Sequence, residues 1–386
     1  MFKILTLNKI SKVGLGQLSD NYTVSDNEAN PDGILLRSFK MHDMELPESL
    51  KAVARCGAGV NNIPLDKCAE KGIVVFNTPG ANANAVKELV ICSLLLSSRK
   101  VVQGINWAKT LKDEGDQAAS LVEKGKSNFV GPEIYGKTLG VVGLGAIGVK
   151  VANAAHHLGM NVVGYDPYLS VDSAWHLTRF AEKATSFDDL LAQSDYITIH
   201  VPALPSTIGM FNSEAFAKMK KGARLLNFSR DTLVDTTDIQ AALEDGTVSC
   251  YVTDFATADL LNNDKVICMP HLGASTPESE ENCAVMASNE IKDFLENGNI
   301  INSVNYPNCD MGEKNGERMT VAHKNVPNML KHITDLIAAK GVNIDTMLNK
   351  SRGDYAYTML DLQGKIDPAI AKEIEDIDGV IKVTLL

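Results

Sequence analysis

Apolar and polar residues alternate in short blocks along most of the chain. In the first 78 residues, apolar runs at 34–36, 52–54 and 72–76 are separated by polar segments with helical character. Runs of this length, bounded by turn residues, predict β-strands. Strands alternating with helices are typical of βαβ units and of a parallel sheet. We therefore expect an α/β fold for this part of the chain.

Two longer patterns extend the α/β prediction. Residues 85–107 place apolar side chains at helical spacing, which predicts a helix long enough to bridge two domains. Between residues 138 and 270, apolar runs predict strands at 139–142, 162–165, 197–201, 224–228, 251–253 and 266–269. Six strands with helices between them predict a doubly wound sheet. A helix at about 277–298 follows, and it would return the chain to a discontinuous first domain.

The pattern changes after residue 305. Residues 306–318 are rich in Pro, Asn, Gly and charged side chains, which predicts a linker. The remaining residues read as strand, helix, two strands, helix and strand over about 70 residues, the order of a ferredoxin-like unit.

Composition and charge narrow the classes of function. The 386 residues include 37 basic and 48 acidic side chains, for a net charge of −11, and 45% are hydrophobic. The hydrophobic fraction is that of a globular protein, and the acidic balance argues against a nucleic-acid partner. No apolar run is long enough for a membrane span. The seven cysteines are scattered without a C-x-x-C pair, which predicts reduced thiols in the cytoplasm and no metal site.

A glycine-rich turn predicts a dinucleotide site. It follows the strand at 139–142 and opens a helix near residue 146. In such turns the first glycine allows the tight bend, the second allows close approach of a pyrophosphate, and the third allows helix–strand packing. The helix N-terminus favours the anion. We expect the backbone of Gly143, Gly145, Ala146, Ile147 and Gly148 to hold a pyrophosphate.

Asp166 supports the same prediction. It ends the next strand, 18 residues after Gly148, where a carboxylate can accept hydrogen bonds from a ribose. The alternative is a plain turn-forming aspartate before Pro167. No Arg or Lys adjoins Asp166, so the pattern favours NAD over NADP.

Charged residues gather at the predicted carboxyl ends of the later strands, where ligands bind in such sheets. Arg230 follows one strand, Asp254 the next and His271 the last. Arginine offers a two-donor fork to a carboxylate, and histidine can take and return a hydroxyl proton. This set suits hydride transfer on a 2-hydroxy acid. The alternative for His271 is a capping or buried histidine.

Several motifs together carry a resemblance that spans essentially the whole chain. They are Arg-Ser at 37–38, Arg-Cys-Gly-Ala-Gly-Val-Asn-Asn at 55–62, Asn-Thr-Pro at 77–79, Gly-Lys-Thr-Leu-Gly at 136–140, Asn-Phe-Ser-Arg at 227–230 and Pro-His-Leu-Gly-Ala-Ser-Thr at 270–276. On these motifs the chain resembles the D-2-hydroxyacid dehydrogenase family, in the form that oxidises D-3-phosphoglycerate and carries a C-terminal ACT domain. The last motif is highly specific for the family, whereas the glycine loop alone is not.

The resemblance implies a fold and a reaction. The implied fold is a flavodoxin-like substrate-binding domain (1–96 and 284–305), a Rossmann NAD-binding domain (97–283), a linker (306–317) and a ferredoxin-like ACT regulatory domain (318–386). The implied reaction is the NAD-dependent oxidation of D-3-phosphoglycerate to 3-phosphohydroxypyruvate, which begins L-serine synthesis. The alternatives are another D-2-hydroxyacid dehydrogenase, acting on glycerate, hydroxypyruvate or hydroxyglutarate, and a non-catalytic NAD-sensing protein on the same fold.

The resemblance also implies roles for single residues. Arg230 matches the active-site arginine and His271 the proton-transferring histidine. Arg37, Ser38, Ala58 and Gly59 match substrate-binding positions, with Arg37 the candidate for the phosphate. The cofactor-binding matches outside the glycine loop are His200, Val201, Pro202, Thr207, Phe228, Ser229, Asp254, Gly273 and Ala274.

The chain departs from the family pattern at two places. Ala146 stands where the glycine loop usually has an arginine. The family's catalytic glutamate lies five residues after the position of Asp254 and precedes a proline, whereas this chain has Asp259 followed by Leu260. We expect Asp259 to orient His271, since a shorter carboxylate can still accept its N–H. The alternative is that Asp259 is a solvated loop carboxylate and that Asp254 or water bonds the histidine.

The C-terminal unit resembles serine-binding ACT domains at its first strand-to-helix turn. There His323 and Asn325 match effector-contacting positions, and Asn343 is a weaker candidate. Asn328 stands where the pattern usually has glycine. The expected partners are thus a small phosphorylated 2-hydroxy acid, an L-serine effector and further copies of the chain in a dimer or tetramer. A dimerising module without a ligand is the alternative to serine binding.

Overall fold

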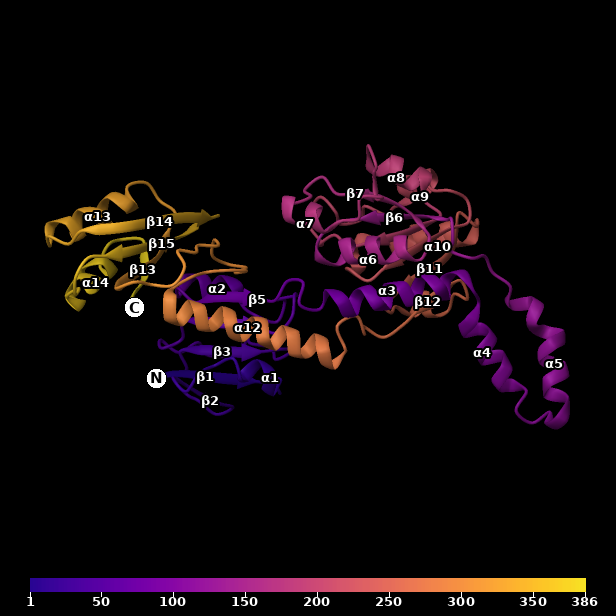
Figure 1. Ribbon diagram of the computed structural model, residues 1–386, viewed down its shortest axis with the longest axis horizontal. Helices are drawn as coiled ribbons and strands as arrows, with labels where there is room; N and C mark the ends of the chain where they lie inside the picture. Colours follow the sequence, from indigo (N-terminus) through magenta and orange to yellow (C-terminus); the bar gives the residue numbers. More distant parts are fainter. The chain divides into compact units, whose positions relative to one another are not determined.

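The computed structural model describes residues 1–386, and its contacts divide the chain into two compact units (Figure 1). One unit comprises Met1–Asn82 with Pro277–Leu386, and the other is Ala83–Thr276. Helix α3 (Ala83–Ser98) falls in the second unit, whereas the sequence placed a boundary at 96/97. The predicted separation of the C-terminal residues as a third domain stays a prediction, because they cluster with the first unit.

The first unit contains a parallel five-stranded sheet. Its strands are β1 (Phe2–Leu7), β2 (Tyr22–Ser25), β3 (Gly33–Leu36), β4 (Ala52–Arg55) and β5 (Val74–Asn77). The order β2-β1-β3-β4-β5 is that of flavodoxin-like sheets, which confirms the predicted fold. All four residues of β3 are buried, which explains the continuous apolar run in its sequence.

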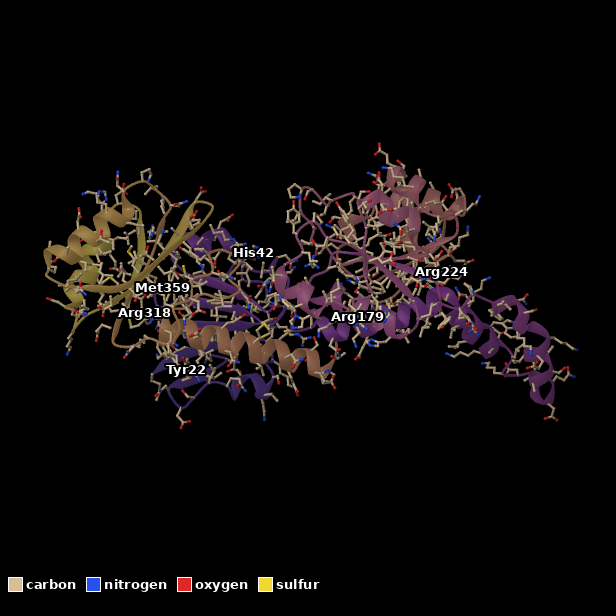
Figure 2. The ribbon with its side chains drawn as sticks, turned by 45° about the horizontal axis from the view of Figure 1, so that its top comes forward. Tyr22, His42, Arg179, Arg224, Arg318 and Met359 are labelled. Atoms are coloured by element: carbon tan, nitrogen blue, oxygen red, sulfur yellow. The ribbon has the colours of Figure 1, made fainter.

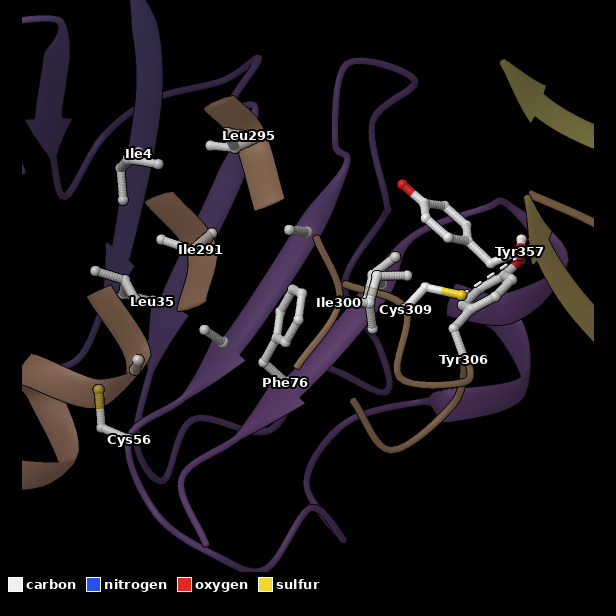
Figure 3. Packing of buried hydrophobic residues seen from close by; sticks show 14 of the residues in the cluster. Ile4, Leu35, Cys56, Phe76, Ile291, Leu295, Ile300, Tyr306, Cys309 and Tyr357 are labelled. Atoms are coloured by element: carbon white, nitrogen blue, oxygen red, sulfur yellow. Dashed lines mark hydrogen bonds between the residues drawn. The ribbon is translucent and has the colours of Figure 1, made fainter. Parts of the chain in front are cut away.

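Helix α12 (Pro277–Asn297) returns to this sheet and packs directly on it. Figure 3 shows Ile291 and Leu295 of α12 over Ile4 and Leu35, all members of one buried cluster. A Cβ at Gly33 would lie 2.5 Å from Ile291 Cδ1, so a larger residue there would displace the Ile291 side chain. The short helices α1 (Lys12–Leu15) and α2 (Leu65–Glu70) complete this part of the unit.

The second unit is built on a parallel seven-stranded sheet. Its strands are β6 (Thr138–Val142), β7 (Asn161–Tyr165), β8 (Glu182–Lys183), β9 (Tyr196–Ile199), β10 (Ala223–Asn227), β11 (Val248–Thr253) and β12 (Val266–Cys268). The order β12-β11-β10-β9-β6-β7-β8 reverses direction between β6 and β9, as in a Rossmann fold. The helices between the strands are α6 (Ala146–His157), α7 (Val171–His176), α8 (Phe187–Gln193), α9 (Ser213–Lys218), η3 (Asp231–Leu233), α10 (Thr236–Glu244) and α11 (Ala258–Leu261). The predicted doubly wound sheet is therefore confirmed.

A helical arm precedes this sheet. The predicted helix at 85–107 is in fact two helices, α3 and α4 (Val101–Thr110), separated at Arg99 and Lys100. After α4 come η1 (Gly115–Gln117), α5 (Ala118–Gly125) and η2 (Lys126–Phe129). Neither α4 nor α5 has a buried residue, and the two run side by side away from the sheet (Figure 1).

The C-terminal residues form an antiparallel sheet covered by two helices. Strands β13 (Glu317–Lys324), β14 (Ile344–Arg352), β15 (Tyr355–Leu362) and β16 (Val380–Leu385) are in the order β14-β15-β13-β16. Helices α13 (Met329–Ala339) and α14 (Pro368–Glu375) bury Ile333 and Ile370 against one face. This is the predicted ferredoxin-like βαββαβ fold.

The other face of this small sheet packs within the first unit. Tyr357 and Met359 of β15 share a buried cluster with Tyr306 and Cys309, which lie in the predicted linker. Figure 3 shows Tyr357 beside Tyr306 and Cys309. Arg318 on β13, which is labelled in Figure 2, is also buried. Its guanidinium donates to Asp361 and to the carbonyls of Asn297 and Gly312. The segment before β13 is therefore part of a packed core.

Candidate active site

The glycine loop lies where the Rossmann sheet reverses its strand order. Gly143 follows β6 with φ +92°, and a Cβ there would come 2.7 Å from the His200 carbonyl oxygen. Gly148 lies in the first turns of α6, where a Cβ would meet the Gly143 carbonyl at 2.0 Å. Gly145 differs, because no protein atom lies within 4 Å of its Cβ position. The first and third glycines are thus required by the fold, and the second leaves open space at the N-terminus of α6.

That helix end presents unpaired donors. Gly145 is the N-cap of α6 and makes no side-chain cap, and Ala146 and Ile147 form the first turn. Backbone N–H groups in a first turn have no acceptor within the helix, so they can bind an anion. Gly145 and Ala146 are exposed, as such a role requires.

Asp166 closes β7 beside this loop. Its Oδ2 accepts a hydrogen bond from the Leu144 N–H at 2.8 Å, and its Oδ1 accepts one from the Tyr168 N–H at 2.8 Å. The bond from the Tyr168 N–H is the turn-forming contact that was the alternative role for Asp166. The carboxylate also fixes the glycine loop, a contact that the spacing of the motif did not predict.

The loops after β9 and β10 are tied to one another. His200 is largely buried, its Nε2 lies 3.0 Å from Thr198 Oγ1, and burial lowers its pKa to about 3. The Ser229 hydroxyl donates to the Val201 carbonyl, next to buried Phe228. The Thr207 hydroxyl donates to the Pro202 carbonyl at 2.6 Å. Several cofactor candidates therefore serve to fix the shape of these loops.

Three charged residues come together at the carboxyl ends of β10, β11 and β12. His271 Nδ1 lies 3.8 Å from Asp254 Oδ2, and the His271 ring packs edge-on against Phe255. Burial raises the pKa of Asp254, and the charges of His271 and Arg230 oppose that rise. Its Oδ1 is buried without a hydrogen-bond partner.

The flanking groups remain accessible. The His271 side chain is 65% exposed, against 1% for Asp254. Arg230 is exposed, and its guanidinium donates to the Ser229 carbonyl at 2.6 Å. Gly273, in the loop that continues to Ala274, leaves its Cβ position 3.9 Å from Asp254 Oδ2. The arrangement is a buried carboxylate flanked by an open histidine and an open arginine.

Asp259 does not join this group. It lies in the first turn of α11, exposed, and makes no ion pair or hydrogen bond with His271. The carboxylate nearest to the histidine is that of Asp254, which lies at ion-pair distance without a hydrogen bond to the ring. The orientation of His271 by Asp259 stays a prediction without support from the geometry.

The substrate candidates belong to the other unit. The N–H groups of Arg37, Ser38 and Phe39 all donate to Asn8 Oδ1, at 3.2, 3.0 and 2.9 Å. Asn8 has φ +91°, and it holds this turn at the end of β3. The Arg37 guanidinium forms an ion pair with Glu280 at 2.6 Å. Sequence reasoning missed both partners, because neither is near Arg37 in the chain.

Ala58 and Gly59 lie in the turn after β4. The Ala58 carbonyl accepts a hydrogen bond from the Asn77 amide at 2.6 Å, and Gly57 before it has φ +151°. The N–H groups of Ala58 and Gly59 have no acceptor in the chain. They are therefore available to bind an anion.

In the C-terminal module the side chains of the effector candidates form hydrogen bonds within the protein. His323 is buried, with Nδ1 2.8 Å from the Lys324 carbonyl and Nε2 2.8 Å from Thr358 Oγ1. Asn325 donates to the Gly353 carbonyl, and Asn343 donates to Asp345. Asn328 has φ +66°, the left-handed conformation that glycine adopts readily and asparagine tolerates.

Comparison with known proteins identifies the family. The family model described as D-isomer specific 2-hydroxyacid dehydrogenase, NAD binding domain, matches residues 93–273. A D-3-phosphoglycerate dehydrogenase of Haemophilus influenzae is 30% identical over 358 residues, covering 89% of this chain and 83% of that protein. The chain belongs to the D-isomer specific 2-hydroxyacid dehydrogenases. The matched residues are the family's NAD binding domain.

Other members vary more in length and sequence. A putative D-3-phosphoglycerate dehydrogenase of Schizosaccharomyces pombe is 31% identical, covering 89% of this chain and 76% of that protein. The chain spans only 49% to 59% of three further D-3-phosphoglycerate dehydrogenases that it resembles. A solved glyoxylate reductase from Paecilomyes thermophila shares the fold with a TM-score of 0.65 at 25% identity, covering 78% of this chain and 98% of that one.

Proposed function

We propose that the chain oxidises D-3-phosphoglycerate to 3-phosphohydroxypyruvate with NAD, the first step of L-serine biosynthesis. The observation that carries the proposal is the group formed by Arg230, Asp254 and His271. It lies at the carboxyl ends of the sheet whose reversal point carries the glycine loop. The substrate is inferred from the similar proteins that are named D-3-phosphoglycerate dehydrogenase.

The residues of the loop fit NAD. The open space at Gly145 and the free N–H groups of Ala146 and Ile147 suit the pyrophosphate, and Asp166 suits the adenosine ribose. Bound at these residues, NAD would supply the acceptor for the hydride from C2 of the substrate. Ala146 offers no side-chain charge, so the backbone donors and the helix dipole supply the attraction.

His271 moves the proton in this mechanism. An exposed imidazole can take the proton of the C2 hydroxyl as the hydride leaves and release it to solvent afterwards. Asp254, beside Nδ1, fixes the ring and stabilises the imidazolium that forms. Asp254 is well suited to this because its buried charge is weakly screened by water.

The remaining groups bind the acid itself. Arg230 offers its fork to the reacting oxygen and the carboxylate, and the free N–H groups of Ala58 and Gly59 bind the other carboxylate oxygen. Arg37 and Ser38 then bind the phosphate, with Arg37 leaving Glu280 to do so. The cationic groups matter because the protein as a whole carries a charge of −11.

The decisive assay measures NADH formation with a panel of D-2-hydroxy acids. D-3-phosphoglycerate is expected to be the preferred substrate, and His271→Asn should abolish turnover while NAD still binds. A preference for glycerate or hydroxyglutarate would assign another member of the family. Turnover on no acid, with NAD binding intact, would leave a non-catalytic NAD sensor.

We also propose that the chain assembles into a homo-oligomer through the α4–α5 arm. The arm has no buried residue and exposes Val101, Ile105 and Val122. An arm of this kind is stabilised by packing against another copy. Sedimentation should show a dimer or tetramer, and Ile105→Glu should shift it toward monomer. An unchanged assembly would assign the contact elsewhere, for example to the open edge of β14.

L-serine regulation is proposed for the C-terminal module. The left-handed Asn328 gives the turn before α13 the backbone that glycine would give, which supports the resemblance to serine-binding modules. His323 and Asn325 would have to exchange internal hydrogen bonds for the effector. Activity is expected to fall across a serine titration, and a flat response would leave an assembly module without a ligand.

The proposed location is the cytoplasm. All seven cysteines are free, and Cys56, Cys68, Cys283 and Cys309 are buried. Unpaired thiols of this kind are typical of a reducing compartment. No helix of the structure has the length and apolar character to span a membrane.

A further inference from the structure

A cavity of about 620 Å³ lies in the first unit, and none of the residues that line it was placed in the active site. Its walls come from α12, from the chain that follows this helix at 299–302, and from Gly80 and Ala81. The volume is in the range of small-molecule sites. Neither the cofactor nor the substrate proposed above accounts for it.

Glu290 on α12 is the unusual residue of this cavity. Glu290 is only 8% exposed. This burial raises the pKa of its carboxyl group to about 8. Oε1 accepts a hydrogen bond from the Asn302 amide at 2.7 Å, but Oε2 is buried and has no partner. A buried carboxyl oxygen without a partner costs stability, so the site favours a ligand that supplies a donor.

The other polar groups of the cavity are acceptors or amides. Asp293 lies one turn further along α12, and its Oδ1 accepts from the amides of Asn297 and Asn299. Asn282 and Asn289 complete the polar lining. No Lys, Arg or His side chain lines the cavity, so nothing there offsets a carboxylate charge.

The rest of the lining is apolar. Ala81, Val285, Met286 and Ile301 provide a surface on which a hydrocarbon chain can pack. A zwitterionic amino acid fits poorly, because the cavity has no cationic side chain for its carboxylate. A divalent cation fits poorly as well, since such ions prefer a small cage of oxygen ligands to a wide, largely apolar cavity.

We propose that this cavity binds a small organic amine, with an ammonium group on Glu290 and Asp293 and its carbon chain on the apolar wall. Binding ionises Glu290, so at neutral pH its proton is released as the cation enters. Gly80 and Ala81 end two residues before α3 starts the other unit, and α12 begins where the chain returns. A bound amine therefore lies within the first unit, against segments close to both points where the chain passes between the two units.

Isothermal titration of the full chain with 1,4-diaminobutane and with spermidine tests the proposal, with 1,4-butanediol as the neutral isostere. The amines should bind and the diol should not. Glu290→Gln and Asp293→Asn should each weaken binding at least tenfold. Glu281→Gln, exposed on the same helix and outside the cavity, is the matched control and should bind as the wild type does. Thermal melting verifies that each variant is folded.

Proton release separates this site from general attraction to an acidic protein. Titrations in two buffers of different ionisation enthalpy should show close to one proton released at pH 7 and much less at pH 9. The groups facing Glu290 do not confuse this result. The Cys56 thiol stays protonated at both pH values, because burial raises its pKa to about 12.

Three outcomes would overturn the proposal. One is that no amine binds at millimolar concentration, and another is that the diol binds as well as the diamine. The third is that Glu281→Gln weakens binding as much as Glu290→Gln does. If Glu290→Gln does not fold, Asp293→Asn and the proton count of the wild type decide the matter. Binding is measured without substrate, so a negative result leaves the dehydrogenase proposal untouched.

Discussion

At the scale of single residues, the carboxylate beside His271 is Asp254, which directly follows β11, and not Asp259, which the family pattern predicts. Asp254 contacts His271, whereas Asp259 faces solvent. We predict that Asp254→Asn lowers kcat on the order of 10²- to 10⁴-fold, because the imidazolium loses its counter-charge. Asp259→Asn should change kcat by less than about twofold, because water screens the charge of a solvated carboxylate. Steady-state NADH formation measures both.

The same pair sets the acid limb of the pH profile. Burial raises the pKa of Asp254, so this carboxylate takes up its proton at a higher pH than an ordinary aspartate does. Only the ionised form stabilises the imidazolium, so kcat/KM should fall as the pH is lowered through this raised pKa. The Asp254→Asn variant should lack that limb. If instead Asp259→Asn removes it, the histidine is oriented as the sequence pattern predicted.

Arg37 gives a second prediction at this scale. It is held by Glu280 and is the candidate for the substrate phosphate. Arg37→Gln should raise KM for D-3-phosphoglycerate by about 10- to 100-fold, the value of a charge-assisted contact. KM for unphosphorylated D-glycerate should change by less than about twofold, as expected for loss of a phosphate contact alone. Glu280→Gln is the control for the ion pair, and an equal loss with both acids would contradict the assignment.

Glu290 links burial to stability. Its pKa is about 8 in the folded protein and near 4.5 for a free glutamate, so the folded state holds a proton that the unfolded state has lost. Stability should therefore fall as the pH rises from about 4.5 to 8, by up to about 1.4 kcal/mol per unit. Glu290→Gln has no buried carboxyl to ionise. The variant should therefore be more stable than wild type at pH 8 but not at pH 4.5. Urea unfolding at the two pH values measures the difference.

At the scale of elements, different glycines of the loop serve folding and cofactor binding. Gly145→Ala places a methyl in open space, whereas Gly143→Ala forces a clash at φ +92°. We predict that Gly145→Ala weakens NAD binding at least tenfold and leaves the melting temperature within about 2 °C, since the methyl blocks only the pyrophosphate approach. Gly143→Ala should lower the melting temperature. An unchanged NAD affinity in folded Gly145→Ala would remove the loop from the site.

The elements that could be predicted are those whose burial imposes a pattern. The strands β6, β9 and β10 are buried on both faces and appear in the sequence as apolar runs. Strand β8 has two exposed residues and leaves no such signal. The break between α3 and α4 was missed because apolar spacing continues across it.

The site could be predicted in part for the same reason. Groups at strand ends, such as Arg230 and His271, are placed by the order of the strands. Asn8, by contrast, organises the turn at Arg37 across 29 residues of sequence, a contact that no local pattern carries. Asp254 lies beside His271, whereas the spacing of the family motif predicts the histidine contact for Asp259.

At the scale of the whole molecule, the three predicted domains fall into two compact units, because the C-terminal residues cluster with the first domain. The C-terminal sheet shares its buried face with the first sheet's unit through Tyr357, Tyr306 and Cys309. Residues that share one core unfold together. Calorimetry should therefore resolve two transitions, one for each unit, and no separate transition for residues 318–386.

Ligand and mutation should assign these two transitions independently. NAD binds the Ala83–Thr276 unit and should raise its transition alone, by about 2.7 kcal/mol at one hundred times the dissociation constant. Tyr357→Ala empties the shared core and should lower the other transition by about 3–5 kcal/mol. Tyr357→Phe loses only the hydrogen bond to the Gly298 carbonyl and should cost about 1 kcal/mol. A third transition, moved by Tyr357→Ala alone, would show that the C-terminal sheet is an independent domain, as the sequence pattern first predicted.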